Sequence, residues 1–332
     1  MSHHQRPVTA SHRLEAGLLA ALEALSSACP TGLWVNLGAL AGALAARLAP
    51  VRRADLRESL QIAFGDSIDP SERRRLEREA YKNLAMLSAE TLALARRGRR
   101  WLDQRVTEAP GLPILKGLCD EGRAPICVTG HFGNWELMGA WAAQHVRAAT
   151  LAKPLHNALV QQRVADTRQR LGLRVLWTDR PNLPRDILET IRGNWALNFL
   201  ADQDMRHEGI FVDFFGRPAS STPAPALFAL RTGRLLLPVF LVRLGPTRHR
   251  FEAGPPIDPA TAVGETRDEK IHDLTQRLTR RIEDMARLHP AQYFWFHRRW
   301  KTTPRAAEKR RVTLQRRRNE ALAPKPDEPP AP

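Results

Sequence analysis

The stretch ICVTGHFGNWELMGAW, residues 126–141, joins a β-prone run to a helix through a turn that contains two glycines. The run ICVT (126–129) is typical of a buried strand, and Asn134 is a good N-terminal cap for the helix that follows. In open α/β sheets, ligands bind beyond the carboxyl ends of the strands, where the chain turns into a helix. His131 lies at that point, so the turn is a candidate site.

Glu136 falls in the first turn of the predicted helix, and we expect its carboxylate to fold back on the His131 imidazole. A carboxylate in that place orients the ring and stabilises its protonated form. Because the segment GHFGNWEL (130–137) contains no serine or cysteine nucleophile, the pair suits removal of a proton from a substrate hydroxyl that attacks an acyl group directly. The pair alone also fits a capped loop histidine. A zinc site is disfavoured, because no third ligand is evident nearby.

Short apolar runs alternate with helical patterns after about residue 110, which favours an α/β fold with a mostly parallel central sheet flanked by helices. No internal repeat is visible. The predicted strands are ICVTG (126–130), ATLAK (149–153), RVLWT (174–178), WALNFLADQ (195–203) and LLLPVFLVRL (235–244), with RFEAGPP (250–256) as a possible edge strand. Helices are predicted over residues 135–146, 159–171, 183–192, 224–230 and 266–288.

Residues 1–50 form a separate region, in which a polar arm precedes two apolar stretches, LEAGLLAALEAL (14–25) and TGLWVNLGALAGALAARLAP (31–50). They predict an N-terminal helical element that associates with a membrane. Residues 31–46 are fewer than the roughly 20 apolar residues that a transmembrane helix requires. An interfacial or membrane-dipping pair, a true span and a soluble helical hairpin all stay open, and a cleaved signal peptide is not indicated.

A long amphipathic helix is predicted from Asp69, with Pro70 at its first position and Gly98 beyond its end. The apolar positions of this helix recur at steps of three and four, so that one face packs on the body behind it; they are Leu76, Ala80, Leu84, Leu87, Thr91 and Leu94.

At the other end of the chain, residues 305–332 combine a basic run, EKRRVTLQRRR, with a proline-rich end, and we expect a disordered tail.

The composition is strongly basic, with 51 Lys and Arg against 35 Asp and Glu among 332 residues and a formal net charge of +16. Such a chain predicts acidic partners, which include nucleic acid, anionic lipid and an acidic carrier protein. A nucleic-acid-binding protein is disfavoured, because the aromatic residues gather in GNWE, DFFG and YFWFH instead of alternating with basic residues. The three cysteines are far apart and predict neither a disulfide framework nor a metal site.

Four blocks of the sequence resemble the lysophospholipid acyltransferase superfamily and, within it, the lipid A late acyltransferase branch of lauroyl and myristoyl transferases. The catalytic signature of that superfamily is H-x4-D/E, and the version found in the branch, GHFGNWE (130–136), is present here. The resemblance extends over residues 52–304. The other blocks are KPLHNALVQQRVADTRQRLG (153–172), the segment from LADQD to RLLLPV (200–239) and QYFWFHRRWKTTP (292–304).

This resemblance implies an acyltransferase domain over residues 51–304 that transfers an O-acyl group from a thioester, with His131 as general base and Glu136 holding it. The developing oxyanion is expected to meet backbone amides or Arg168. The substrate-binding residues that it implies are Asn134, Lys153, Asn157, Arg168, Asp202, Gln203, Asp204, Thr222, His297, Arg298 and Arg299.

The resemblance also implies the substrates and the place of the reaction. The donor is expected to be acyl carrier protein, with coenzyme A as the less favoured donor. The acceptor is expected to be a hydroxyl of an anionic or phosphorylated glycolipid, a lipid A precursor, at the membrane surface on the cytoplasmic face of the inner membrane. A lysophospholipid, an ornithine lipid or a phosphatidylinositol mannoside is the alternative acceptor, and an inactive membrane scaffold is the alternative to an enzyme. No metal or other cofactor is expected.

Overall fold

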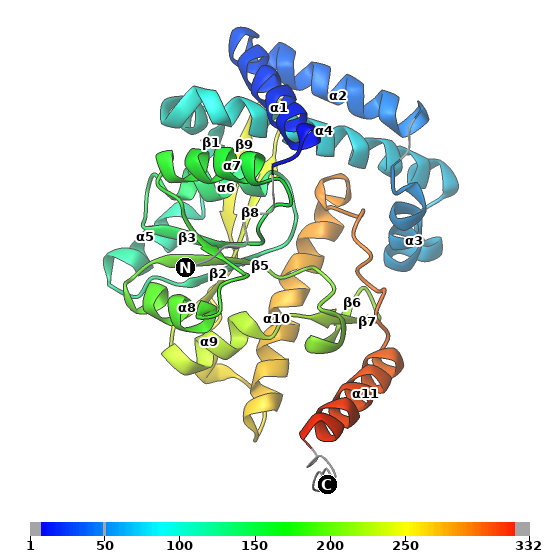
Figure 1. Cartoon of the computed structure of the whole chain (residues 1–332), viewed down its shortest axis with the longest axis vertical. Helices are drawn as coiled ribbons and strands as arrows, with labels where there is room; N and C mark the ends of the chain where they lie inside the picture. Colours follow the sequence, from blue (N-terminus) through cyan, green and yellow to red (C-terminus); the bar gives the residue numbers. More distant parts are fainter. Residues whose placement is uncertain (1–7, 49–50, 323–332) are drawn as a thin grey trace, which may run out of the picture.

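The computed structural model describes residues 8–48 and 51–322, which fold around a central sheet. Seven strands lie in the order β1-β9-β8-β2-β5-β3-β4, and neighbouring strands are parallel except for the antiparallel pair β8 and β9 (Figure 1). This arrangement confirms the predicted α/β fold with a mostly parallel sheet. The strands are β1 (Val106–Glu108), β2 (Ile126–Thr129), β3 (Ala148–Ala152), β4 (Arg174–Trp177), β5 (Ala196–Leu200), β8 (Leu236–Arg243) and β9 (His249–Ala253).

Helices cover both faces of this sheet. Successive residues of a strand point to opposite sides, so a strand of apolar residues needs a cover on each side. In β2, Cys127 packs in one apolar core with residues of α4 and α6, whereas Ile126 and Val128 pack in another with residues of α8, α9 and α10. Burial on both sides explains why β2 is apolar along its length. The first face carries α4 (Pro70–Asp103), α6 (Trp135–Ala142) and α7 (Ala158–Arg170), with α5 (Leu112–Asp120) beside β9; the second carries α8 (Leu183–Arg192), α9 (Ala224–Thr232) and α10 (Arg267–Leu288).

Two N-terminal helices, α1 (Ala10–Ala28) and α2 (Thr31–Leu48), lie along α4 on one side of the molecule (Figure 1). The helix α2 comes close to α4 at Gly42, where an added Cβ atom would lie 2.5 Å from the carbonyl oxygen of Tyr81. A glycine is therefore needed for this contact between the two helices. The shorter helix α3 (Arg53–Phe64) follows and also contacts α4.

The helices α1 and α2 expose many large apolar side chains. Among the described helices, none is by itself long and apolar enough to cross a membrane, and only residues 31–48 and 53–67, two segments that meet at 95°, pass that test together. The two segments give a bent pair, not a straight helix. The exposed leucines on α1 and α2 are Leu14, Leu18, Leu25, Leu33, Leu37, Leu40, Leu44 and Leu48.

The long helix α4 begins where the sequence predicts it. The Asp69 carboxylate accepts hydrogen bonds from the backbone N–H groups of Ser71 and Glu72, which confirms Asp69 as the N-terminal cap. The regular helix is broken at Gly98, where the sequence predicts its end. This glycine has φ 73° and ψ −169°, which are not helical, and a second helical segment within α4 runs on to Asp103. Glycine adopts this positive φ without strain.

Two strand predictions need correction. The segment RFEAGPP contains β9, which lies between β1 and β8 and is therefore not an edge strand; the short β1 takes the edge. A separate antiparallel hairpin, formed by β6 (Ile210–Phe214) and β7 (Arg217–Ser221), was not predicted. The hairpin forms a two-stranded sheet of its own and does not extend the main sheet.

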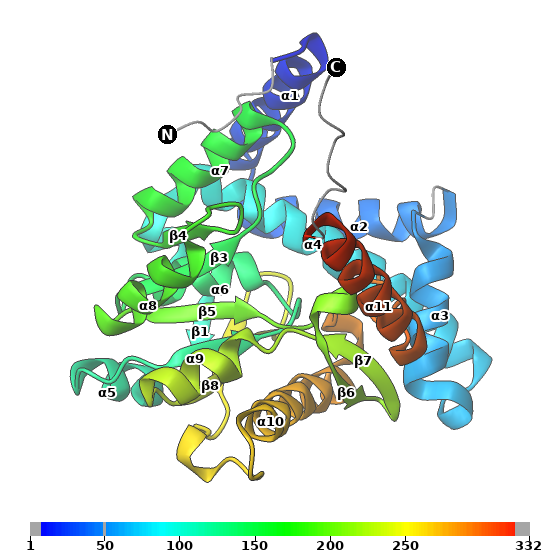
Figure 2. The same ribbon diagram turned by 60° about the horizontal axis from the view of Figure 1, so that its bottom comes forward.

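The basic segment after residue 304 forms the helix α11 (Pro304–Leu322), so the prediction of a disordered tail does not hold there. Ala307 is buried, and Arg311 donates hydrogen bonds to the carbonyl oxygens of His207 and Gly209. These contacts place α11 beside the turn that precedes β6 (Figure 2). Composition alone missed them, because the partners lie about one hundred residues away in sequence. The rest of the predicted tail and the polar arm up to residue 7 lie outside the described residues.

Candidate active site

The carboxyl ends of β2 and β5 bring His131 and Asp202 together. The two strands are parallel neighbours, with Thr129 opposite Leu200, so the residues that follow them meet at one edge of the sheet. His131 Nδ1 lies 2.7 Å from Asp202 Oδ1, and the His131 backbone N–H donates to Asp202 Oδ2 at 2.8 Å. The carboxylate is thus held by both the ring and the backbone of His131.

Asp202 is ionised in this pair. Burial of the carboxyl group raises its pKa, but the neighbouring His131 and His297, together with the hydrogen bonds from His131, outweigh burial and hold the pKa of Asp202 well below its ordinary value. An ionised carboxylate can only accept hydrogen bonds, so Nδ1 of His131 carries the ring proton. The lone pair on Nε2 is then available to take a proton from a substrate.

Glu136 does not take the orienting role that the sequence predicts for it. Its two carboxylate oxygens accept hydrogen bonds from Arg168 of α7 at 2.9 and 3.0 Å. The preceding residue, Trp135, packs edge-on against the His131 imidazole, with ring centroids 4.9 Å apart. Successive residues of a helix point in directions about 100° apart, so Glu136 is turned toward α7 when Trp135 faces the imidazole. Asp202 therefore orients His131.

Two glycines allow the backbone of this turn to follow its path. Gly133 has φ 57°, and an added Cβ atom would lie 1.8 Å from the carbonyl oxygen of Leu241, so only glycine fits. An added Cβ atom on Gly130 would lie 3.1 Å from Asp202 Oδ2. The turn can therefore press against β8 on one side and approach the Asp202 carboxylate on the other.

His297 and Gln203 lie on the polar side of the site. The ring centroids of His131 and His297 are 4.6 Å apart. Gln203 Nε2 is 3.4 Å from His131 Nε2 and 3.5 Å from His297 Nε2. Burial, with a smaller contribution from His131, lowers the pKa of His297 to about 4, although Asp202 acts in the opposite direction. His297 is therefore uncharged at neutral pH.

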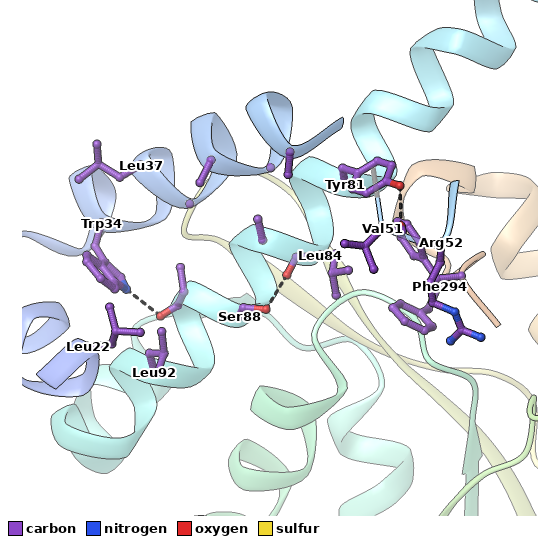
Figure 3. A pocket seen from close by; sticks show the side chains of 17 residues that line it. Leu22, Trp34, Leu37, Val51, Arg52, Tyr81, Leu84, Ser88, Leu92 and Phe294 are labelled. Atoms are coloured by element: carbon purple, nitrogen blue, oxygen red, sulfur yellow. Dashed lines mark hydrogen bonds between the residues drawn. The ribbon is translucent and has the colours of Figure 1, made fainter. Parts of the chain in front are cut away.

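An apolar groove of about 570 Å³ reaches Phe294, whose backbone N–H donates to the His131 carbonyl oxygen at 2.9 Å. Its walls come from α1, α2 and α4 (Figure 3). Phe294 lines the end near the site, with its ring centroid 6.1 Å from that of His131 and 4.5 Å from that of His297. Farther along, Trp34 donates its indole N–H to the Ala89 carbonyl oxygen and joins α2 to α4. The site thus combines a base with a channel for an apolar chain.

Comparison with known proteins shows the family of the chain. A model of the bacterial lipid A biosynthesis acyltransferases matches residues 4–302. The chain belongs to this family. Among its relatives, the lipid A biosynthesis palmitoleoyltransferase of Escherichia coli K12 is 27% identical over 288 residues, which cover 82% of this chain and 89% of the relative. The lipid A biosynthesis lauroyltransferase of the same strain is 24% identical over 289 residues, which cover 83% of this chain and 87% of the relative. The resemblance read from the sequence is confirmed.

Other relatives are named for a different lipid. The phosphatidylinositol mannoside acyltransferase of Mycobacterium tuberculosis H37Rv is 30% identical over 212 residues, which cover 62% of this chain and 63% of the relative. The chain therefore spans less than two thirds of the length of this mycobacterial protein. The names of the relatives agree on acyl transfer and differ in the lipid.

Three of the residues predicted to bind substrate are buried and bonded inside the protein. Asn134 caps α6 and donates to Glu90, Asn157 caps α7 and donates to the His12 carbonyl oxygen, and Arg299 donates to oxygen atoms of β7. Apart from Arg299 Nε, the polar atoms of these side chains have partners inside the protein, so these three predictions are corrected: the side chains support the site from within. Asp202 is likewise buried and acts on His131.

Five further predicted residues have side chains that are at least partly exposed, and their contacts with substrate stay predictions. Arg168 is held by Glu136, and Arg298 donates to Asp55 at 2.7 Å. Asp204 accepts a hydrogen bond from the Thr302 hydroxyl at 2.8 Å. The five residues are Lys153, Arg168, Asp204, Thr222 and Arg298.

Within the described part of the chain, no group of three or more His, Cys, Asp or Glu residues is placed to hold a metal ion.

Sequence inspection missed a buried cluster around Glu90 and the course of the groove. A signal for Glu90 was present, because it follows Leu87 by three residues and so falls on the apolar face of the long helix. A carboxylate at such a position needs a buried partner. Arg243, at the end of the apolar run LLLPVFLVRL, is a cation in a similar position. The two form an ion pair in the structure.

Replacing His297 with asparagine should reduce the loss of stability in acid. The folded-state pKa of His297, about 4, lies below the unfolded value of 6.5, so the unfolded chain binds the extra proton first. The wild-type protein therefore loses roughly 3 kcal/mol of stability from this group as the pH falls from about 6.5 to below 4, and almost none above that window. Unfolding by denaturant at several pH values measures the difference. Equal losses in the variant and the wild type would contradict a half-buried, uncharged His297.

Proposed function

We propose that this chain is a membrane-associated acyltransferase that moves a fatty acyl chain from acyl carrier protein to a hydroxyl of a lipid A precursor at the cytoplasmic face of the inner membrane. The observation that carries the proposal is the His131–Asp202 pair at the end of an apolar groove. A base beside a hydrophobic channel serves both halves of the reaction, the acceptor hydroxyl and the acyl chain.

In the proposed reaction, His131 Nε2 takes the proton from the acceptor hydroxyl as its oxygen attacks the carbonyl carbon of the thioester. Asp202 stabilises the imidazolium that forms. When the tetrahedral intermediate collapses, the carbon–sulfur bond breaks, and His131 gives its proton to the departing thiolate. The products are an ester and a free thiol. Because residues 130–137 contain no serine or cysteine, the acyl group passes directly to the acceptor.

Arg168 is the candidate cation for the oxyanion or for a phosphate of the substrate. Glu136 binds one end of its guanidinium through two hydrogen bonds, which fixes the orientation of the group. Its Nε atom is buried and has no hydrogen-bond partner among the described residues. A buried donor without a partner is costly, so a substrate oxygen that reaches this N–H would be bound favourably. In this proposal Glu136 acts on the substrate through Arg168.

The charge and the apolar surface of the chain support the proposed partners. A net charge of +16 favours both an acidic carrier protein and a phosphorylated glycolipid. The exposed leucines of α1 and α2 lie on the helices that also line the groove, so a bilayer that covers these leucines would meet the groove. Coenzyme A, which carries phosphates, is the other donor to be compared.

A phosphatidylinositol mannoside is the second candidate acceptor. The mycobacterial relative at 30% identity is named for that lipid, whereas the relatives named for lipid A are less similar but align over more of the chain. Both acceptors present a hydroxyl to His131, so the chemistry is the same. The difference lies in the groups that bind the rest of the lipid.

One assay tests the proposal and separates these acceptors. Purified protein in lipid vesicles is given acyl thioesters of carrier protein or coenzyme A, together with lipid A precursors, phosphatidylinositol mannosides, lysophospholipids or ornithine lipids. We expect a product whose mass exceeds that of a lipid A precursor by one acyl group, formed faster from the carrier-protein thioester. Transfer to another lipid alone would replace the proposed acceptor. No transfer from any thioester would refute the proposed activity.

Filling the groove should change the preferred acyl chain. Ala85 lines the groove from α4, and Ala85→Phe takes up space that the chain would occupy. Each methylene group kept out of an apolar site costs about 0.8 kcal/mol, so the loss of room for two methylenes lowers kcat/KM for a long-chain donor roughly tenfold. Short-chain donors should be affected least. Ala21→Phe, on the exposed surface of α1, is the matched control. An unchanged chain preference in Ala85→Phe would remove the groove from acyl binding.

A further inference from the structure

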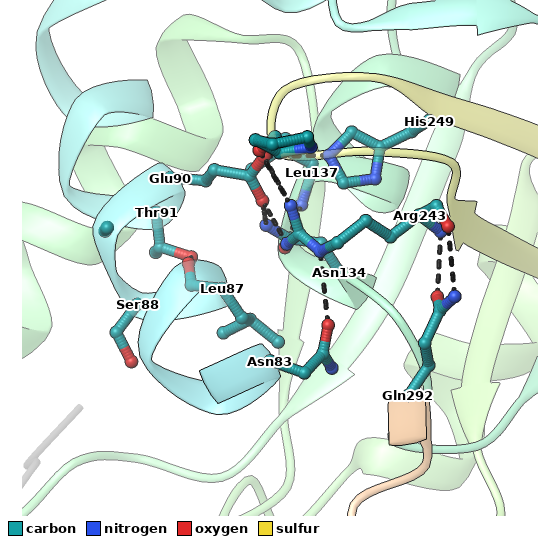
Figure 4. Close-up of polar contacts among 12 residues, drawn as sticks. Asn83, Leu87, Ser88, Glu90, Thr91, Asn134, Leu137, Arg243, His249 and Gln292 are labelled. Atoms are coloured by element: carbon teal, nitrogen blue, oxygen red, sulfur yellow. Dashed lines mark hydrogen bonds and ion pairs between the residues drawn. The ribbon is translucent and has the colours of Figure 1, made fainter. Parts of the chain in front are cut away.

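A buried ionic cluster lies behind the turn that carries His131. Glu90 of α4 has no exposed surface. Its carboxylate accepts hydrogen bonds from Arg243 at 2.6 and 3.0 Å, from His249 Nε2 at 2.8 Å and from the side-chain amide of Asn134 at 2.8 Å (Figure 4). Three separate segments of the chain therefore meet on one carboxylate.

This cluster holds a charge that the core would not retain for stability alone. Burial raises the pKa of Glu90, but His249 and Arg243 outweigh it and lower the pKa to about 2, so the carboxylate stays ionised. A buried ion pair commonly contributes no more stability than well-packed apolar side chains of similar volume. The charged carboxylate instead fixes the positions of its hydrogen-bond donors.

Two routes lead from Glu90 to the catalytic turn. The first is direct, because Asn134 donates to Glu90 while its side-chain oxygen accepts the backbone N–H of Leu137 and caps α6. The second runs through Arg243, whose backbone N–H and C=O both bond the side chain of Gln292. The carbonyl oxygen of Gln292 accepts the backbone N–H of Gly133 at 2.9 Å. The turn is therefore tied to Glu90 on two sides.

The same helix also lines the groove. Ala89 and Leu92 of α4 contribute to its wall, one and two residues from Glu90 in the sequence. A displacement of α4 relative to the turn would therefore separate the acyl chain from the base. A shift of about 1 Å between reacting groups can cost 100-fold in rate.

We propose that Glu90 is a positioning residue, which holds the turn 131–136 against α4 through Asn134 and Arg243 and so keeps His131 at the end of the groove. Its effect on turnover rests on the proposed acyl transfer. Its effect on the turn itself does not.

Two variants test the proposal, and a third serves as control. Glu90→Gln keeps the shape of the side chain but turns one oxygen into a donor that faces other donors. Asn134→Ser keeps a good cap for α6, leaves the pair of Glu90 and Arg243 in place and cuts only the link to the turn. Glu77→Gln removes another buried carboxylate of α4, which pairs with Arg57 and not with the turn.

Hydrogen exchange of the backbone, measured by mass spectrometry on the full chain in vesicles, reports on the turn without any assay of activity. In Glu90→Gln and Asn134→Ser, the amides of residues 131–138 should exchange at least about tenfold faster, and in Glu77→Gln they should not. Unchanged exchange in both variants would overturn the proposal. This result is decisive even if the wild-type protein transfers no acyl group, an outcome that would refute only the proposed function.

Kinetics test the consequence for turnover. Both variants should lower kcat by about 10- to 100-fold, with KM for the thioester within about threefold of wild type, because the groove is intact while the base is displaced. A merely structural role would instead lower the amount of folded protein and leave the kcat of the folded fraction unchanged. Faster exchange with a wild-type kcat in both variants would also contradict the proposal.

Discussion

His131→Ala should lower kcat by about 10³-fold or more, because it removes the group that, in the proposed reaction, takes the proton from the acceptor hydroxyl and returns it to the thiol. Binding should change little, since the groove does not depend on the imidazole. The fold should be retained, because Asp202 still accepts the backbone N–H of residue 131 at 2.8 Å. The rate of acylated product formation, measured by mass spectrometry at saturating thioester, gives kcat.

The melting temperature in vesicles and the affinity for a non-hydrolysable thioester analogue are the controls for this variant. A loss of activity with an unchanged melting temperature and analogue affinity assigns the effect to chemistry. His131→Ala protein that turns over at a near-normal rate would remove the imidazole from the mechanism.

Asp202→Asn should lower kcat by about 10²-fold or more with little change in KM. An asparagine can donate to Nδ1 and so hold the other tautomer of His131, which leaves a proton on Nε2 where the mechanism needs a lone pair. It also removes the negative charge that stabilises the imidazolium. The rates of wild type and variant at saturating substrates, with the melting temperature as control, measure the effect.

Glu136→Gln is the comparison for Asp202→Asn. Glu136 bonds Arg168 and not the imidazole, so its loss should act through the orientation of Arg168. We expect an effect of about tenfold that appears at least partly in KM. The same loss in Arg168→Gln, with no further loss in the double variant, would support this route. A kcat loss in Glu136→Gln that equals or exceeds that in Asp202→Asn would restore Glu136 as the partner of His131.

Local sequence signals predicted the fold and the position of His131. Continuous apolar runs gave the buried strands, and Asn134 marked the start of α6. The partner of His131 was harder to predict, because Glu136 is near in sequence whereas Asp202 is 71 residues away. Only the register of β2 and β5 brings Asp202 to the ring. The sequence predicted both strands but not that they are neighbours in the sheet.

The groove and the Glu90 cluster escaped prediction for the same physical reason. The apolar stretches near the N-terminus predicted helices, but the groove also needs Phe294, from the other end of the chain. Glu90 and Arg243 are charged residues at positions where the pattern is otherwise apolar, and the pattern alone does not predict that they form an ion pair. Long-range contacts of this kind follow from packing, whereas periodicity reports only local structure.

The most direct test of the central claim, that Asp202 acts through His131 as the base, is the single-turnover rate of transfer in a double-mutant cycle. The four proteins are wild type, His131→Ala, Asp202→Asn and the double variant. We predict that the double variant is no slower than His131→Ala, because Asp202 has no base left to orient. Additive losses, in which Asp202→Asn slows the alanine variant by as much as it slows the wild type, would contradict the account.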